Sequence, residues 1–118
     1  MDGIKIELPL ENEYFTTVRL TCGGICAQAD FDVDFTEDFK VCVTESLLIL
    51  KRNGFKRVEI LFNIGEGILA HIQGKDQTGE KTEGVEDEIS YALLDALIGG
   101  VELKKDEDGR VESVRFQA

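Results

Sequence analysis

Cysteine and histidine are the side chains of this sequence that could bind a metal ion or form disulfides. The chain carries three cysteines and one histidine. Cys22 and Cys26 are four residues apart, the spacing of one helix face, whereas His71 falls in a different element. A zinc site needs about four such ligands, and an odd cysteine count does not suit a disulfide framework. We therefore predict buried, reduced thiols, no metal site and no role for His71.

Carboxylates are the most numerous of the remaining reactive groups. The 118 residues include 24 acidic and 13 basic ones, which gives a formal net charge of −11. Affinity for nucleic acids and for anionic membranes comes largely from Lys and Arg, so this charge argues against both partners. Thr44 and Ser46 flank Glu45, but no Ser-His-Asp set that would activate a hydroxyl is apparent. Length and composition predict a single globular domain over residues 1–118.

Alternating apolar and polar residues predict the strands that must position these groups. Five such segments cover residues 4–8, 57–64, 68–73, 101–105 and 111–117. Gly65-Glu66-Gly67 predicts a turn between the second and third strands. The segment from Asp106 to Gly109 predicts a hairpin turn between the fourth and fifth. His71 is expected on the polar face of the third strand.

Apolar residues at helical spacing predict two helices before the second strand. The first runs from Glu11 to Ala29, and Gly23-Gly24 in its middle indicates either a close approach of another backbone or a helix break. The second begins near Asp34, which forms a capping-box-like pair with Glu37, and stops at Asn53-Gly54.

A third helix is predicted after a long polar loop over residues 74–84. Its apolar positions are Val85, Ile89, Ala92, Leu93 and Ala96, and Gly99-Gly100 stops it. The predicted order of elements favours an α+β fold: a two-layer α/β sandwich in which a mixed five-stranded sheet has three helices on one face.

Several segments resemble the anti-sigma-factor serine kinases, a branch of the histidine kinase-like, or GHKL, ATPases. Residues 38–46, Asp-Phe-Lys-Val-Cys-Val-Thr-Glu-Ser, are similar to the family pattern D-[IL]-K-x-A-V-S-E-A, which leads into the nucleotide-binding N box. Residues 18–30 look like the family's first helix, and Leu93 to Leu97 with the two strands that follow match its closing helix and hairpin. The resemblance covers nearly the whole chain and implies the Bergerat, or histidine kinase-like ATPase, fold.

The resemblance implies roles for three residues. Glu45 stands at the position of the glutamate that activates a water or hydroxyl, which makes it the candidate catalytic residue. Asp76 matches the aspartate of the D-x-G-x-G motif, which binds the adenine amino group. Arg19 matches an arginine with which family members contact their protein partner. If these motifs still function, the cofactor is Mg-ATP.

The parts of the pattern that hold magnesium and phosphate are changed in this sequence. Ile49 replaces the N-box asparagine and offers no oxygen to Mg²⁺, although it is expected to face the same pocket as Glu45. Thr78 and Glu80 replace the two glycines of D-x-G-x-G. The lid segment from Thr82 to Glu88 has one glycine and four carboxylates, which suit a helix dipole and not a phosphate. We therefore expect no cofactor and weak or absent binding of Mg-ATP.

The sequence thus predicts a degenerate member of this family that regulates by binding a protein, either a sigma factor or an anti-anti-sigma factor, and that is not an enzyme. One alternative is an active ATP-dependent serine kinase with unusual motifs, and another is a scaffold domain unrelated to sigma regulation. A homodimer is a further option. The chain has no apolar run long enough to span a membrane, and Met1 to Lys5 lack the features of a secretory leader, so we expect a cytoplasmic protein.

Overall fold

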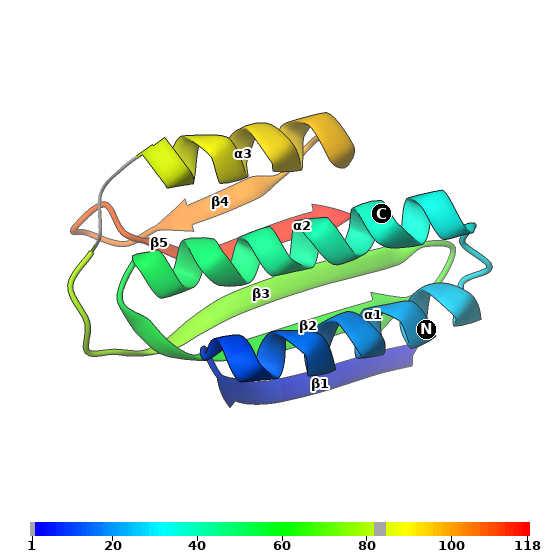
Figure 1. The fold of residues 1–118 in the computed structure, drawn as a ribbon, viewed down its shortest axis with the longest axis horizontal. Coiled ribbons are helices and arrows are strands. Elements are labelled where there is room, and N and C mark those ends of the chain that lie inside the picture. The colour runs from blue at the N-terminus through cyan, green and yellow to red at the C-terminus, as the bar shows by residue number, and fades with distance from the viewer. Residues whose placement is uncertain (1, 82–84) are drawn as a thin grey trace.

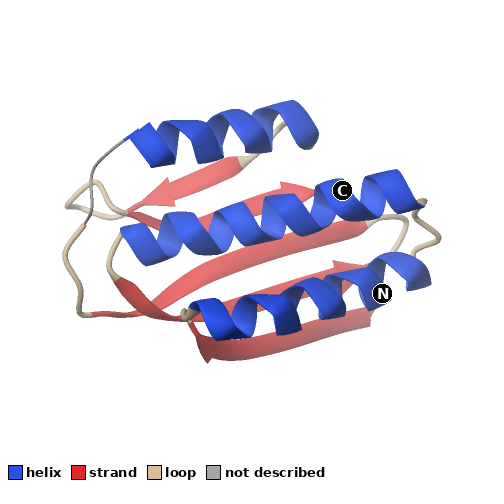
Figure 2. Ribbon diagram, viewed as in Figure 1, coloured by secondary structure: helices blue, strands red, loops and turns tan. Residues whose placement is uncertain are grey.

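The computed structural model describes residues 2–81 and 85–118, which form one five-stranded sheet covered on one face by three helices (Figure 1). In chain order the elements are β1 (Asp2–Pro9), a 3₁₀ turn (Asn12–Tyr14), α1 (Phe15–Gln28), α2 (Val33–Arg52), β2 (Phe55–Ile64), β3 (Ile68–Gln77), α3 (Val85–Leu97), β4 (Glu102–Lys105) and β5 (Val111–Gln117). Figure 2 shows the helices together on one side of the sheet. The α+β sandwich is confirmed, and it is consistent with the histidine kinase-like ATPase fold.

The sheet has the strand order β1-β2-β3-β5-β4. The expectation of a mixed sheet was wrong, because each neighbouring pair in the described residues is antiparallel. The crossover from β3 through α3 does return the chain parallel to β3 as β4. However, β5 then turns back and inserts between them, so the two parallel strands never pair.

The hydrophobic core lies between the sheet and α2, which contacts β2, β3 and β5. Its centre is Phe39 of α2, whose ring centroid lies 6.0 Å from that of Phe62 on β2 and 5.8 Å from that of Phe116 on β5. All three rings are buried. Burying each such side chain contributes about 1.5–3 kcal/mol, so α2 is the helix that holds the sandwich together.

Helix α1 is continuous, and neither explanation offered for its paired glycines holds. A Cβ atom on Gly23 would lie 3.4 Å from Cε of Lys40, a flexible side chain and not another backbone. A Cβ atom on Gly24 would meet nothing within 4 Å. The helix passes through both residues without a break.

Helix α2 begins at Val33, close to the predicted start near Asp34. The predicted capping pair of Asp34 and Glu37 was wrong, because the N-cap is Asp32, whose side chain accepts a 2.7 Å hydrogen bond from the backbone N–H of Phe35. The predicted stop is confirmed. Asn53 closes the last turn through its side-chain amide, which donates to the Ile49 carbonyl at 2.7 Å, and Gly54 follows with φ +90°.

Helix α3 ends where the sequence predicted, because Gly99 and Gly100 follow it with φ of +68° and +58°. Strand β3 extends to Gln77 instead of ending at residue 73, so residues 74–77 of the predicted loop are strand. Residues 82–84 of that loop lie outside the described residues.

Candidate functional site

Glu45 lies on α2 with its carboxylate directed at α3. The hydroxyl of Ser90, a buried residue of α3, donates a 2.6 Å hydrogen bond to Oε2 of Glu45. The candidate catalytic carboxylate is therefore engaged by a neighbouring helix. This hydrogen bond engages Oε2 only, so Oε1 keeps the acceptor capacity with which Glu45 could act as a general base.

Arg52, two turns after Glu45 on the same helix, completes the link to α3. Its Nη2 donates to Oγ of Ser90 at 2.6 Å, and its Nε donates to Oδ1 of Asp87 at 2.5 Å. The Arg52 and Asp87 side chains are only 19% and 14% exposed. We call this chain of contacts, Glu45–Ser90–Arg52–Asp87, the α2–α3 polar bridge. Sequence reasoning missed it, because its partners are 35 to 45 residues apart.

Tyr91 follows Ser90 at the edge of the polar bridge. Partial burial raises the pKa of its phenol, the Asp87 carboxylate raises it further, and the Arg52 guanidinium opposes the rise. The phenol therefore stays protonated at neutral pH. Within the bridge, Arg52 forms an ion pair with Asp87, and Glu45 is reached through the Ser90 hydroxyl.

Ile49 does not share the surroundings of Glu45. Its side chain is fully buried in the hydrophobic core, whereas the Glu45 carboxylate is half-buried and meets Ser90. The expectation that both residues face one pocket is therefore wrong. Residues four apart are neighbours on a helix, but here Ile49 faces the core and Glu45 faces α3.

Asp76 lies near the end of β3 with its side chain exposed and its backbone in the left-handed region, at φ +55°. The loop that follows is fastened to the end of α2. The N–H of Gly79 donates to the Gly54 carbonyl at 2.9 Å, and Nη1 of Arg110 donates to the Gly79 carbonyl at 2.8 Å. A Cβ atom on Gly54 would collide with the Gly79 carbonyl oxygen. Gly79, the one glycine of this five-residue segment, thus makes a close backbone contact with Gly54.

The lid-like segment is described only from Val85 onward, so Thr82, Glu83 and Gly84 lie outside the described residues. The first turn of α3 contains Glu86, Asp87 and Glu88. Carboxylates there interact favourably with the helix dipole. They also place negative charge at the N-terminus of α3, and this charge would repel a phosphate bound there.

Arg19 is exposed on α1, where its Nη2 lies 3.4 Å from the Thr16 hydroxyl. It borders a hollow of about 170 Å³ together with residues of α2, and the structure brings it to the same hollow as Glu45. The lining residues are Arg19, Glu37, Lys40, Val41, Thr44 and Glu45. The Thr44 hydroxyl is buried and has no hydrogen-bond partner within the described residues. Asp76 is not part of this lining.

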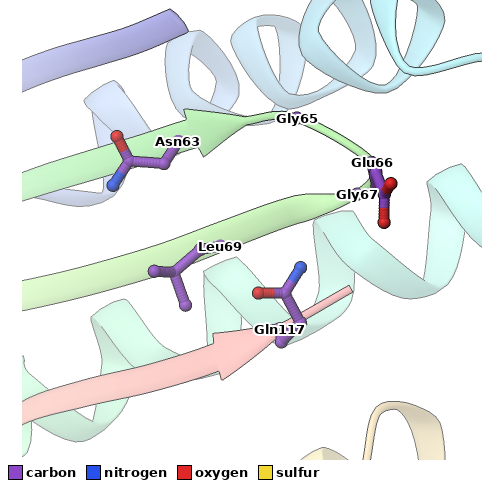
Figure 3. Close-up of a pocket in the computed structure, with 6 residues that line it drawn as sticks. All are labelled: Asn63, Gly65, Glu66, Gly67, Leu69 and Gln117. Carbon is purple, nitrogen blue, oxygen red and sulfur yellow. The ribbon is translucent and has the colours of Figure 1, made fainter. Parts of the chain in front are cut away.

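A larger hollow, about 440 Å³, lies beside the turn between β2 and β3 (Figure 3). Its lining is Asn63, Gly65, Glu66, Gly67, Leu69 and Gln117, so β2, β3 and β5 all contribute. Sequence reasoning gave these residues no site role beyond the turn. His71 lies between Leu61 and Arg115 in the sheet, half-buried among alternate residues that face away from the core.

The three cysteines are free and buried, as predicted. Burial raises the pKa of Cys22 to about 12; the Cys26 thiol adds to the rise and the Lys40 ammonium opposes it. Burial also raises the pKa of Cys42 to about 12, with smaller contributions from Asp38 and Glu45. Such thiols are poor nucleophiles. Within the described residues, no group of three His, Cys, Asp or Glu side chains is placed to hold a metal ion.

The chain is similar over part of its length to curated proteins named serine-protein kinase RsbW. The protein of Listeria monocytogenes EGD-e is 34% identical over 58 residues, which are 49% of this chain and 37% of the relative. That of Staphylococcus epidermidis is 32% identical over 56 residues, 48% of this chain and 35% of the relative. The match thus spans about half of this chain and little more than a third of each relative.

No family model matches the chain. None of the helices in the described residues is both long and apolar enough to cross a membrane. The partial similarity to RsbW agrees with the resemblance to the anti-sigma-factor serine kinases.

Proposed function

We propose that this protein is an anti-sigma-factor-like regulator that acts by binding a protein partner, with little or no binding of Mg-ATP. The observation that carries the proposal is the α2–α3 polar bridge. By the resemblance, the phosphates of a nucleotide would lie between α2 and the start of α3. There, Arg52 is paired with Asp87, and the Ser90 hydroxyl links Arg52 to Glu45.

The surroundings of the polar bridge support the same conclusion. A phosphate would have to approach Glu86 and Glu88 in the first turn of α3, and the only cation of the bridge, Arg52, is already paired with Asp87. Ile49 supplies no magnesium ligand from its position in the core. Opening the site for ATP would leave the half-buried Arg52 or Asp87 without its partner, which typically costs several kcal/mol.

The surface we assign to the partner is the hollow between α1 and α2 that Arg19 borders. Arg19 is exposed, and the buried Thr44 hydroxyl in the same lining lacks a partner among the described residues. A buried hydroxyl without a hydrogen bond costs about 1–3 kcal/mol, which an incoming polar group could recover. A sigma factor or an anti-anti-sigma factor is the partner we expect, with residues 1–118 acting as one cytoplasmic domain and without nucleic acid or membrane.

Isothermal titration calorimetry with Mg-ATP tests the first half of the proposal. We expect no binding heat below about millimolar nucleotide, and no change in the Ile49→Asn variant, because Thr78 and Glu80 would still replace the glycines. Ile49 is a core residue, so the wild-type titration is the decisive one. A micromolar dissociation constant would contradict the proposal and favour an active kinase.

Partner capture from the native host tests the second half. Arg19→Glu should lose a partner that the wild type retains, because reversing one charge of an interfacial pair typically costs several kcal/mol. Arg57→Glu is the matched control, an exposed arginine on β2. Equal retention by both variants would exclude Arg19 from the interface.

A further inference from the structure

Helix α3 has two apolar faces, and the fold uses one of them. On the inner face, Leu94 and Ser90 are buried, and Tyr91 and Leu97 pack against the core while remaining half-buried. This face meets α2. It is not the face marked by most of the apolar positions from which the sequence predicted the helix.

The other face of α3 carries a stripe of four apolar residues separated by four, three and four positions. We call Val85, Ile89, Ala92 and Ala96 the α3 outer stripe. Val85 and Ile89 are 65% and 56% exposed, and both alanines are exposed as well. This spacing is the one by which helices pack on each other, and alanine lets a second helix approach closely. Within residues 2–81 and 85–118, no element covers the stripe.

The charges beside the outer stripe are all negative. The 13 residues of α3 include four carboxylates and neither Lys nor Arg. Asp87 is paired with Arg52 in the polar bridge. Glu86, Glu88 and Asp95 are exposed, and Glu88 and Asp95 each follow a stripe residue by three positions, which places them along its border.

This charge pattern decides between the possible occupants of the stripe. Pairing α3 with the same helix of a second copy would bring carboxylates against carboxylates, and each chain carries a net charge of −11. Like charges placed together in this way cost several kcal/mol. A helix with lysines or arginines beside its apolar residues would instead meet opposite charge on each side.

A hollow next to the stripe offers room for such a basic side chain. It measures about 170 Å³ and is lined by Tyr91, Leu94, Asp95, Val101 and Leu103, between α3 and the segment of β4. A lysine can bury its aliphatic stem against apolar walls while its ammonium meets a carboxylate at the rim. Asp95 supplies that carboxylate.

We propose that the α3 outer stripe docks an amphipathic helix of a partner protein, one whose apolar stripe is flanked by lysine and arginine. The apolar contact excludes water, and the basic flanks pair with Glu86, Glu88 and Asp95. Figure 1 shows α1 and α3 on opposite sides of α2, so this surface is separate from the one around Arg19 and does not depend on it.

Two synthetic helical peptides with the same leucine and alanine stripe test the proposal, one flanked by lysines and the other by glutamates. Fluorescence anisotropy of labelled peptides should show the lysine peptide binding and the glutamate peptide not binding. Ile89→Glu should weaken binding at least about tenfold. Leu20→Glu, which changes a residue that is 73% exposed on α1, is the matched control and should bind as the wild type does.

A charge-reversal variant makes the test independent of any single apolar contact. Glu88→Lys with Asp95→Lys should transfer binding from the lysine peptide to the glutamate peptide. Equal binding of both peptides, binding of neither, or no effect of Ile89→Glu would overturn the proposal. So would a concentration-dependent dimer in sedimentation that Ile89→Glu abolishes, because the occupant would then be a second copy of this chain.

Discussion

The two sides of α2 are closed in different ways. Towards α1 the contact includes apolar side chains and thiols. Cys22 and Cys26 of α1 lie close to Lys40 and Thr36 of α2, and both thiols are buried. We call this contact the thiol seam. Towards α3 the contact includes the Glu45–Ser90–Arg52–Asp87 polar bridge.

This difference supports the proposal that a partner binds on the α1 side of α2 and that Mg-ATP does not bind on the α3 side. A ligand-binding cleft needs polar groups that are free to meet the ligand. In the polar bridge Arg52 is already paired with Asp87 and bonded to Ser90, so a ligand that used Arg52 would have to compete with both contacts. Beside the thiol seam, Arg19 and Thr44 line an open hollow, and the buried Thr44 hydroxyl has no hydrogen-bond partner among the described residues. By the resemblance, a nucleotide would bind on the α3 side, where Arg52 is already paired.

Alkaline pH should have the largest effect on the free energy of unfolding, because it ionises the buried thiols of α1 and α2. Cys22 and Cys42 have a pKa of about 12 in the folded protein, against an ordinary value of 9.0. Unfolded chains therefore release these protons first. The free energy of unfolding should be unaffected by these groups below pH 9 and should fall as the pH rises from about 9 to 12.

Urea denaturation followed by circular dichroism at pH 8, 9, 10 and 11 measures this effect. Lysines and tyrosines also lose protons in that range, so a cysteine variant is needed to isolate the contribution of the thiols. A Cys22→Ala, Cys42→Ala double variant should show a flatter pH dependence than the wild type. An unchanged slope in that variant would remove the thiols as its cause.

Breaking the polar bridge should have the next largest effect on the free energy of unfolding. Arg52→Ala leaves Asp87 only 14% exposed and without its partner, so we expect a loss of about 3 kcal/mol in the free energy of unfolding. Lys104→Ala is the matched control, because Lys104 is 75% exposed in its contact with Glu112 and should cost less than about 1 kcal/mol. Equal losses in the two variants would show that the bridge does not stabilise the α2–α3 contact.

Introducing a hydroxyl into the thiol seam should lower the free energy of unfolding by less than breaking the polar bridge does. Cys22→Ser places a polar group where the cysteine is fully buried, and we expect a loss of about 2 kcal/mol if the hydroxyl finds no acceptor. Cys22→Ala removes the sulfur without adding polarity and separates the cavity from the hydroxyl effect. If the Cys22→Ser variant were as stable as the wild type, the surroundings of Cys22 would offer the hydroxyl an acceptor.

The sequence was most informative where one face of an element is apolar and the other polar. Alternation located all five strands, although it ended β3 at residue 73 because Lys75, Asp76 and Gln77 are polar at an exposed strand end. It could not show that β5 would insert between β3 and β4. On α3 both faces have apolar residues, so periodicity alone could not tell which one the fold would bury.

The candidate site was harder to predict, because its contacts join distant residues. Glu45, Asp76 and Arg19 were found by resemblance, yet the structure gathers Glu45 with Arg52, Ser90 and Asp87 and not with Asp76. The available signals were weak. Ser90 is a polar residue on the inner face of α3, and Arg52 is a basic residue in the last turn of α2.

The smallest expected effect is a gain in stability at the paired glycines of α1. Gly24 is exposed and helical, and a Cβ atom there would meet nothing within 4 Å. Gly24→Ala should therefore raise the free energy of unfolding by about 0.5–1 kcal/mol, since alanine loses less backbone entropy in a helix. Gly23→Ala should gain less, because its Cβ would meet Cε of Lys40 at 3.4 Å.

Urea midpoints of the two alanine variants measure this difference directly. The larger gain at Gly24 would mean that α1 is an ordinary helix whose exposed glycine is not needed for the fold of the isolated chain. Partner capture with Gly24→Ala then adds a functional readout, because Gly24 lies on the same helix as Arg19. A variant that is more stable but no longer retains the partner would place Gly24 within the contact surface, since a close approach of another chain needs a position without a side chain. A loss of stability in Gly24→Ala would instead contradict the account of α1 as a continuous, unstrained helix.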